Sequence, residues 1–358
     1  MRTRSALLTL LLIVTTAEAV HAQSQVAELN EAGWKMIQAG DGTRAGRYFA
    51  DALTVRPNDP ILLLGAGAAA HLRGESQKAI ASLRRALDGD PSLVHASRLL
   101  GQLAYNEGDL TLAINTYERA LAFAPNDSEM KGSLASWRAD AEVHRSFEER
   151  RYDRFRVMFQ GRADEPLAAD ATTILNTAFW QIGRTLGAYP SDTVVVMLYT
   201  EQQFRDITRA PEWADGLYDG RIRIPVAGAS HRPDAFERVL VHELSHAMVA
   251  SIAPDGVPAW LHEGLAQYFE GENVAAARRR LKAAGRVIPL RDLETTFTHL
   301  DAAEARIAYD QSLVAVETLL QRPGFIWTRL LYELSGNTRT EAALRSFGIS
   351  YEDLESTF

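Results

Sequence analysis

The chain has 358 residues, of which 46% are hydrophobic and 23% charged, and its formal net charge is −8. This composition is typical of a globular protein with about two domains, and it excludes fibrous, wholly disordered and low-complexity classes. The acidic balance argues against binding to nucleic acid or to an anionic membrane surface, and the lack of cysteine excludes a disulfide framework.

Residues 1–22 have the three-part layout of a secretory signal peptide. Two arginines precede an apolar core over residues 6–14, and small residues follow up to Ala19 and Ala22, the two candidate cleavage sites. The core is shorter than the about 20 apolar residues that span a bilayer, and retention as an anchor is the alternative. We therefore predict an exported protein, periplasmic or extracellular, with no stable membrane span after cleavage.

The next segment repeats itself at a spacing of 34 residues. Small residues recur where two helices must approach closely, a large apolar residue recurs between them, and a proline recurs where the second helix ends. The recurring positions are Gly33, Gly67 and Gly101, then Ala45, Ala79 and Ala113, then Phe49, Leu83 and Tyr117, and finally Pro57, Pro91 and Pro125. This pattern resembles the tetratricopeptide repeat (TPR) family, with three repeats over residues 26–127 and a capping helix and linker over residues 128–151.

The resemblance implies an all-α solenoid, right-handed, whose concave groove often holds a peptide or a partner protein. We therefore expect the repeats to serve protein–protein recognition, although the groove positions indicate no particular ligand. The alternative for this region is a spacer that binds nothing tightly.

A different texture begins after Arg151, where the 34-residue register ends. Short β-type runs now alternate with helical segments, and from Pro233 onward the chain is almost entirely helical. We therefore predict a second domain of the α+β class over residues 152–358, which folds without the repeats. Its first elements are strands over residues 155–159 and 194–199, with a helix over residues 168–187 between them.

Residues 220–226 predict a further strand, at the edge of the sheet. They alternate polar and apolar, and Pro225 has no N–H to donate to a neighbouring strand, which an edge tolerates best. An extended peptide could add to such an edge through main-chain hydrogen bonds. The alternative is an ordinary edge strand that binds nothing.

The sequence His242-Glu243-Leu244-Ser245-His246 lies in a predicted helix. A spacing of four residues puts both imidazoles on one face, where two ring nitrogens can bind one Zn²⁺. Glu243 is placed to face a water at that metal. Two ordinary helix histidines are the alternative, but most of the surrounding residues are apolar, and buried histidines would need polar partners.

A catalytic zinc site needs a third protein ligand. The extended motif HExxHxxGxxH fails, because Val249 and Ile252 occupy the positions of its glycine and third histidine. A glutamate on a following helix is the other option, and Glu263 lies 17 residues after His246 in the segment W-L-H-E-G-L-A, residues 260–266. The neighbouring His262 is an alternative ligand, although consecutive helical residues point about 100° apart. Asp255 is a weaker alternative.

These two motifs together resemble the gluzincin zinc metallopeptidases of the peptidase MA-like type, over about residues 152–320. The resemblance implies a thermolysin-like α+β domain that binds one Zn²⁺ through His242, His246 and Glu263. It implies Glu243 as the general base in the hydrolysis of peptide bonds.

Two further positions bear on this resemblance. The segment A-Y-D-Q-S, residues 308–312, resembles a family segment after the zinc helices and makes Tyr309 a candidate catalytic donor to the substrate carbonyl oxygen. A structural tyrosine at a helix start is the alternative. Several gluzincins place an acid one turn after the third ligand, where this chain has Gln267, so the partners of the zinc-binding histidines stay unassigned.

The leading hypothesis is therefore an exported zinc metallopeptidase that acts on a peptide or protein substrate, with repeats that recognise proteins. The alternative is a TPR scaffold whose peptidase-like domain is catalytically unproductive. The basic run Arg278–Arg280 is interpreted as a solvated helix face without a function.

Overall fold

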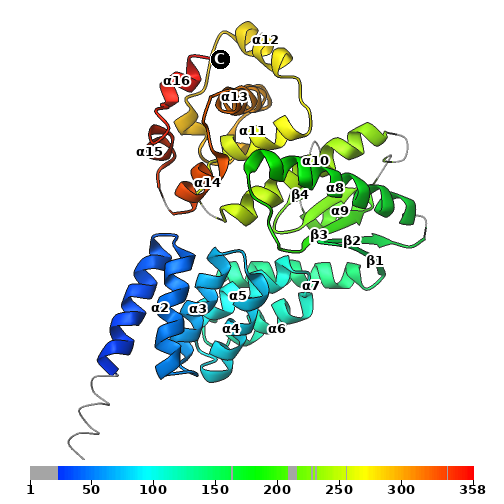
Figure 1. The fold of residues 1–358 in the computed structure, drawn as a ribbon. Coiled ribbons are helices and arrows are strands. Elements are labelled where there is room, and N and C mark those ends of the chain that lie inside the picture. The colour runs from blue at the N-terminus through cyan, green and yellow to red at the C-terminus, as the bar shows by residue number, and fades with distance from the viewer. Residues whose placement is uncertain are drawn as a thin grey trace, which may run out of the picture. The chain divides into compact units, whose positions relative to one another are not determined.

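The computed structural model describes residues 23–162, 164–208, 216–226, 229, 232–254, 256–336 and 338–358. The predicted signal peptide over residues 1–22 and the alternative ligand Asp255 lie outside them. The chain divides into two compact units (Figure 1). We call the first, up to residue 104 and over 111–131, the repeat unit. The second, over 105–110 and 132–358, is the sheet unit.

The repeat unit is built from antiparallel helices, as the 34-residue spacing predicts. A helix over residues 23–38 is followed by α2 (Gly42–Val55), α3 (Pro60–Leu72), α4 (Ser76–Gly89), α5 (Val94–Asn106) and α6 (Leu110–Ala120). Helix α3 packs on both α2 and α4. Asp59 caps α3 by accepting from two backbone N–H groups, and Pro60 occupies its first turn, where no N–H partner is required.

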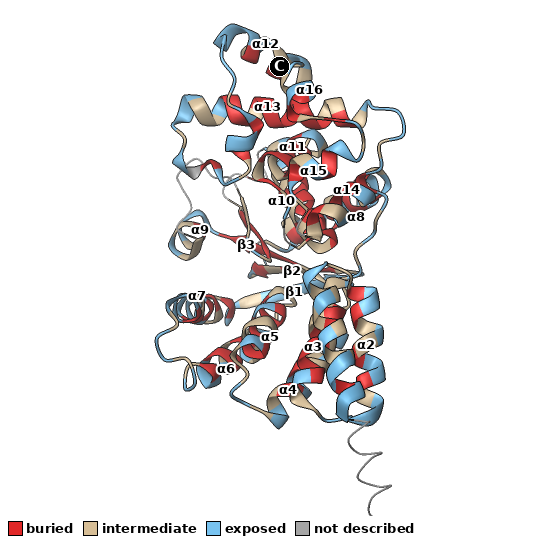
Figure 2. Cartoon of the chain, turned by 90° about the vertical axis from the view of Figure 1, so that its left-hand side faces the viewer, coloured by how far each residue is buried: buried red, intermediate tan, exposed pale blue. Residues whose placement is uncertain are grey.

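The recurring small residues have the role that the sequence predicts for them. A Cβ atom at Gly33 would clash with the ring of Phe49, and one at Gly67 would clash with Leu83. Gly101 stands in the same relationship to Tyr117. In each repeat the glycine therefore lets its helix approach the large apolar side chain of the next helix, which explains the buried faces in Figure 2.

The sheet unit contains five strands in the order β1-β2-β3-β5-β4. The three inner strands β2, β3 and β5 are parallel, and β1 and β4 pair antiparallel at the two ends. The strands are β1 (Phe147–Tyr152), β2 (Phe155–Gln160), β3 (Val194–Tyr199), β4 (Leu217–Tyr218) and β5 (Ile222–Pro225).

Helices cover both faces of this sheet. The helices before and between the strands are α7 (Ser128–His144), α8 (Glu165–Leu186) and α9 (Glu201–Thr208). Those after them are α10 (Pro233–Ile252), α11 (Ala259–Phe269), α12 (Val274–Ala284), α13 (Ala302–Leu320), α14 (Trp327–Ser335), α15 (Thr340–Arg345) and α16 (Tyr351–Glu355), with 3-10 turns η2 (Leu290–Leu293) and η3 (Phe297–His299). Val196 and Leu198 of β3 enter the core with α8 and α10, whereas Tyr199 joins a second cluster with residues of α7 and α9. Strand β3 is therefore buried on both faces, as its continuous apolar run predicts.

Two expectations differ from the structure. The capping helix and linker expected over residues 128–151 is a helix only to His144, because Phe147–Tyr152 form β1 and pair with β2. The expected boundary at Tyr152 therefore falls inside a hairpin, and the sheet unit begins earlier in the chain. The strand around Pro225 is also not the edge strand, because β5 lies between β3 and β4. Pro225 is tolerated there because the two residues of β4 pair with Ile222 and Arg223.

A buried polar cluster joins β5 to α7 within the sheet unit. Arg223 is 1% exposed and donates to both carboxylate oxygens of Asp140, which is fully buried, over 3.2 and 2.6 Å. It also donates to the hydroxyl of Tyr199 over 2.6 Å and to that of Tyr105. Arg221 donates to the carbonyl oxygen of Tyr105 over 2.8 Å and lies over its ring. The last turn of α5 and most of α7 are therefore structural parts of the sheet unit.

No helix in the described part of the chain has the length and apolar character needed to cross a bilayer.

Candidate metal centre

Helices α10 and α11 carry the predicted metal ligands. Pro233 opens α10, and the helix buries its apolar side against the sheet, with Glu243 only 6% exposed. His242 and His246 lie on its half-buried side, one turn apart. After a short connection, α11 begins beyond Pro258 and presents Glu263 to the same place.

The three predicted ligand atoms converge. The Nε2 atoms of His242 and His246 are 3.2 Å apart, and Oε2 of Glu263 lies 3.7 and 3.9 Å from them, respectively. Zinc–ligand bonds of 2.0–2.2 Å in a tetrahedral site place ligand atoms about 3.3 Å from one another. Two imidazoles and one carboxylate are also the donor set of many catalytic zinc sites. The residues therefore fit a zinc ion.

The alternative ligand His262 does not join this trio. Its ring lies 5.6 Å from the ring of His246, and among the described residues the group that could hold a metal consists of His242, His246 and Glu263. Burial lowers the pKa of His262 and keeps it neutral. It is a neighbour of the site.

Burial and charge give the two glutamates different protonation behaviour. Burial raises the pKa of Glu263, but His246 and His242 outweigh that effect and lower it overall, so this side chain is a carboxylate. Burial raises the pKa of Glu243 to about 7, and the nearby carboxylates of Glu263 and Glu270 add to the rise against the opposing effect of His242. A carboxyl group with this pKa can both accept and return a proton near neutral pH.

The two histidines also differ. Burial lowers the pKa of His246 to about 3, so its imidazole is neutral, which is the form that binds a metal. Burial acts in the same direction on His242, but hydrogen bonds to Glu263 and Glu270 outweigh it and raise its pKa well above the usual value. A bound cation would take over the role of that proton at His242.

Comparison with protein families gives a match for each of the two parts of the chain. The model of the peptidase MA superfamily matches residues 175–358, just over half of the chain, and two tetratricopeptide repeat models match residues 33–94 and 70–136. The chain belongs to the peptidase MA superfamily. The predicted fold class, an all-α TPR solenoid followed by an α+β domain of peptidase MA type, is confirmed.

The peptidase MA domain contains an acid at the metal site that the sequence analysis missed. Oε2 of Glu270 lies 3.3 Å from Nδ1 of His242. Glu270 is the C-cap of α11, two turns beyond Glu263, whereas Gln267 occupies the position where the family resemblance placed an acid. Only the crossing of α10 and α11 brings it to His242, so the one available signal was its spacing of seven residues from Glu263 on the same helix.

The candidate donor Tyr309 lies near the carboxylates of the peptidase MA site. Burial raises its pKa, and Glu263, Glu243 and Glu270 raise it further, so its phenol is a neutral O–H donor. Its ring packs edge-on against Phe297, with centroids 5.3 Å apart. Helix α13 comes this close because Gly264, next to Glu263, has no side chain: a Cβ there would clash with the carbonyl oxygen of Ser312.

Strand β4 begins beside the proposed base. A Cβ atom at Gly216, directly before β4, would lie 2.8 Å from Oε1 of Glu243 and 2.8 Å from Val239. The sheet edge that adjoins Glu243 is therefore β4, and not the strand over residues 220–226 that the sequence predicted as the edge.

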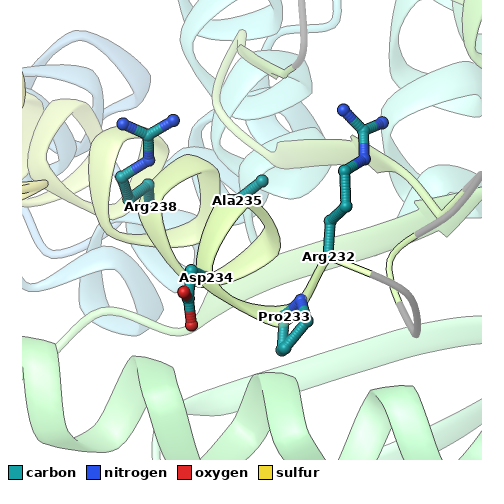
Figure 3. A pocket seen from close by; sticks show the side chains of 5 residues that line it. All are labelled: Arg232, Pro233, Asp234, Ala235 and Arg238. Atoms are coloured by element: carbon teal, nitrogen blue, oxygen red, sulfur yellow. The ribbon is translucent and has the colours of Figure 1, made fainter.

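A pocket opens at the start of α10 in the peptidase MA domain. It is lined by Arg232, Pro233, Asp234, Ala235 and Arg238 (Figure 3). Arg238 lies one turn before His242 on the same helix face, and Figure 3 shows Asp234 pointing away from both guanidinium groups. Neither Arg232 nor Arg238 forms an ion pair with a residue of the described chain. The pocket adjoins the metal ligands but contains none of them.

Proposed function

We propose that this protein is a zinc-dependent peptidase that hydrolyses peptide bonds with Glu243 as general base. One observation carries the proposal: three ligand atoms of the types that bind zinc converge within 3.9 Å, with a buried carboxyl group on the same helix. Membership of the peptidase MA superfamily supports the reaction class.

Each residue has a distinct task in this proposal. His242, His246 and Glu263 would hold the ion, which when bound supplies Lewis acidity that lowers the pKa of water and polarises the scissile carbonyl. Glu243 accepts the proton of the attacking water and returns it to the leaving amine, for which its position on α10 between the two histidine ligands places it. Tyr309 donates its O–H to the carbonyl oxygen as negative charge develops there.

The remaining parts of the chain would bring the substrate to this chemistry. The edge of β4 can align an extended peptide through main-chain hydrogen bonds beside Glu243. The repeats are proposed to recognise a protein substrate or partner, as TPR solenoids commonly do. The signal-like segment over residues 1–22 supports export to the periplasm or the cell exterior.

Two glutamate variants test the proposal. Glu243→Gln should retain one zinc per chain and its melting temperature, while peptide cleavage falls by roughly 10² to 10⁴, the usual contribution of general acid–base catalysis. Glu263→Gln should lose zinc, because a neutral amide is a poorer ligand than a carboxylate. Glu237→Gln, which removes an exposed charge from the same helix, is the matched control and should change neither quantity.

The outcome separates an enzyme from a scaffold. A parent protein that binds one zinc but cleaves no peptide of a broad library would contradict the catalytic proposal and favour the scaffold. A parent protein that binds no zinc would show that the three ligands are misassigned.

A further inference from the structure

We infer that the ion pair between Arg280 and Asp310 positions Tyr309, by fixing the rotation of α13 about its own axis. The inference rests on the function proposed above and adds to it a positioning residue on α12, which contains none of the metal ligands. It also gives a role to a basic run that the sequence analysis left without one.

The pair joins α12 to α13 with two parallel hydrogen bonds. Nε of Arg280 donates to Oδ2 of Asp310 over 2.8 Å, and Nη2 donates to Oδ1 over 2.6 Å. Asp310 is 2% exposed, so its carboxylate depends on this guanidinium for its charge balance. A bidentate Arg–carboxylate pair has one preferred orientation, and it therefore restrains the direction of Asp310 and not only its distance.

The rest of the basic run is also engaged. Nη2 of Arg278 contacts Oε2 of Glu317 over 2.8 Å, and Nη1 donates to the carbonyl oxygen of Thr357 over 2.6 Å. Arg279, by contrast, is exposed. The interpretation of Arg278–Arg280 as a solvated face is therefore wrong for two of its three residues, because α12 packs along α13.

A second anchor acts at the next position of α13. Gln311 is fully buried, and its side-chain amide forms two hydrogen bonds of 2.8 Å with the backbone of Ile288, one to the N–H and one to the carbonyl oxygen. In an α-helix, Asp310 and Gln311 point about 100° and 200° away from Tyr309. Because Asp310 and Gln311 are both anchored, the rotation of α13 is fixed, and with it the direction in which Tyr309 leaves the helix.

The direction of Tyr309 matters because its hydroxyl lies far from the helix axis, so that a small rotation of α13 moves it a long way. An atom about 8 Å from a helix axis moves by roughly 1.4 Å for each 10° of rotation. A displacement of about 1 Å can cost up to 10² in rate when a group must meet a reacting atom. The close contact between Gly264 and Ser312 limits how near α13 can lie to α11 but does not fix its rotation, which is the displacement that the ion pair opposes.

The test compares Arg280→Gln with Tyr309→Phe, alone and combined, on the full-length zinc-loaded protein. Each single change should lower kcat by about 10- to 100-fold with KM within about twofold and zinc content unchanged. Because Arg280 acts through Tyr309, the double variant should lose less than about threefold more than Tyr309→Phe alone. Arg279→Gln removes the adjacent, exposed charge and should leave kcat unchanged.

Two additional measurements keep the result interpretable. Arg280→Lys keeps the charge but cannot form the bidentate pair, so its kcat should lie between those of the parent and Arg280→Gln. Binding of a phosphinic peptide, whose tetrahedral anion resembles the transition state, reports the contact of Tyr309 without turnover. Its affinity should fall by the same factor in Arg280→Gln and in Tyr309→Phe, and no further in the double variant.

The failures are distinguishable. Multiplicative losses in the double variant, or a Tyr309→Phe variant as active as the parent, overturn the positioning inference while the proposed peptidase function stands. A parent protein that neither cleaves peptides nor binds the phosphinic peptide overturns both.

Discussion

Oε2 of Glu270 lies 3.3 Å from Nδ1 of His242, while Nε2 of the same ring faces His246 and Glu263. When Nδ1 donates its proton to a carboxylate, the lone pair of the imidazole is placed on Nε2, which is the atom directed at the metal site. Glu270 therefore determines both the tautomer and the orientation of one ligand.

Glu270→Gln should consequently weaken zinc binding without abolishing it. Loss of such an orienting carboxylate typically costs about 10- to 100-fold in metal affinity. Competition with a chelator measures the affinity directly, and Glu237→Gln again controls for the loss of one negative charge. Equal affinities of the parent and Glu270→Gln would mean that the contact with His242 does not orient it.

The contact between α11 and α13 predicts an unusually strong effect of one methyl group. In Gly264→Ala the new Cβ would clash with the carbonyl oxygen of Ser312, so the helices must separate next to the ligand Glu263. We expect a loss of about 1 to 3 kcal/mol in the free energy of unfolding, as for other overpacked sites, and weaker zinc binding.

Gly132→Ala is the matched control for that change. A Cβ at this exposed helical position would have no neighbour within 4 Å, and alanine favours a helix over glycine by roughly 0.5 to 1 kcal/mol. Urea denaturation should therefore show opposite signs for the two substitutions. A Gly264→Ala protein as stable as the parent would show that the two helices can adjust.

How much the sequence revealed depended on the range of each interaction. The convergence of the three candidate ligands could be predicted because each motif is local and the helix period alone puts His242 and His246 on one face. The contact of Glu270 could not, since it depends on how two helices cross. The pair Arg280–Asp310 joins residues 30 positions apart, and such a contact leaves no periodic signal in the sequence.

The same reasoning explains the misplaced edge strand. Pro225 indicated an edge strand because it has no N–H to donate to a neighbouring strand. The true edge strand β4 has only two residues, which is too short to be recognised from its composition. The pairing of Leu217 with Arg223 therefore emerged only from the structure.

Asp140→Ala should be among the most destabilising substitutions in the chain. It would remove the carboxylate that Arg223, which is 1% exposed, contacts through two nitrogens, and would leave the partly exposed Asp219 as its counter-charge. We therefore expect a loss of about 3 kcal/mol, at the lower end for a broken buried ion pair. Glu201→Ala breaks an exposed ion pair with Arg205 and should cost less than about 1 kcal/mol. Comparable losses in the two variants, measured by urea denaturation, would contradict the importance of the buried pair.

A fragment of residues 152–358 should not fold, contrary to the expectation from the repeat register. It lacks Tyr105, Asp140 and nearly all of β1. Arg221 therefore loses its carbonyl acceptor, Arg223 loses its buried carboxylate, and β2 loses its antiparallel neighbour. Circular dichroism should show no cooperative unfolding transition for this fragment, in contrast to residues 23–358. A cooperative transition with bound zinc would show that α7 and β1 are dispensable.

His144 predicts how stability depends on pH. Its Nε2 lies 2.7 Å from the hydroxyl of Tyr199, and burial lowers its pKa to about 4, with Asp140 opposing and Arg221 and Arg223 adding to the shift. The unfolded chain takes up a proton near pH 6.5, whereas the folded protein does so only near pH 4. The contribution is therefore complete above pH 6.5 and is lost as the pH falls through this window.

Because of His144, the free energy of unfolding should be about 2 kcal/mol lower at pH 5 than at pH 7.5. His144→Gln keeps an acceptor for Tyr199 but cannot be protonated, so its stability should fall by about that much less over the same interval. Urea denaturation of both proteins in the presence of a chelator removes any bound metal, and the titration of the histidines and glutamates at that site is common to both proteins and cancels in the comparison. Parallel pH profiles of the two proteins would contradict the assignment to His144.

The ion pair between Asp140 and Arg223 also has a consequence for the order in which the protein can fold during synthesis. The two residues are separated by 83 positions, and at about 5 to 20 residues per second the ribosome adds the second roughly 4 to 17 s after the first. Over this interval α7 has been synthesised, but Asp140 cannot be buried at low cost, because its partner Arg223 does not yet exist. Helix α7, the first after the repeats, therefore acquires its final packing only when a much later part of the nascent chain arrives, and a ribosome stalled before Arg223 should present α7 in a protease-sensitive form.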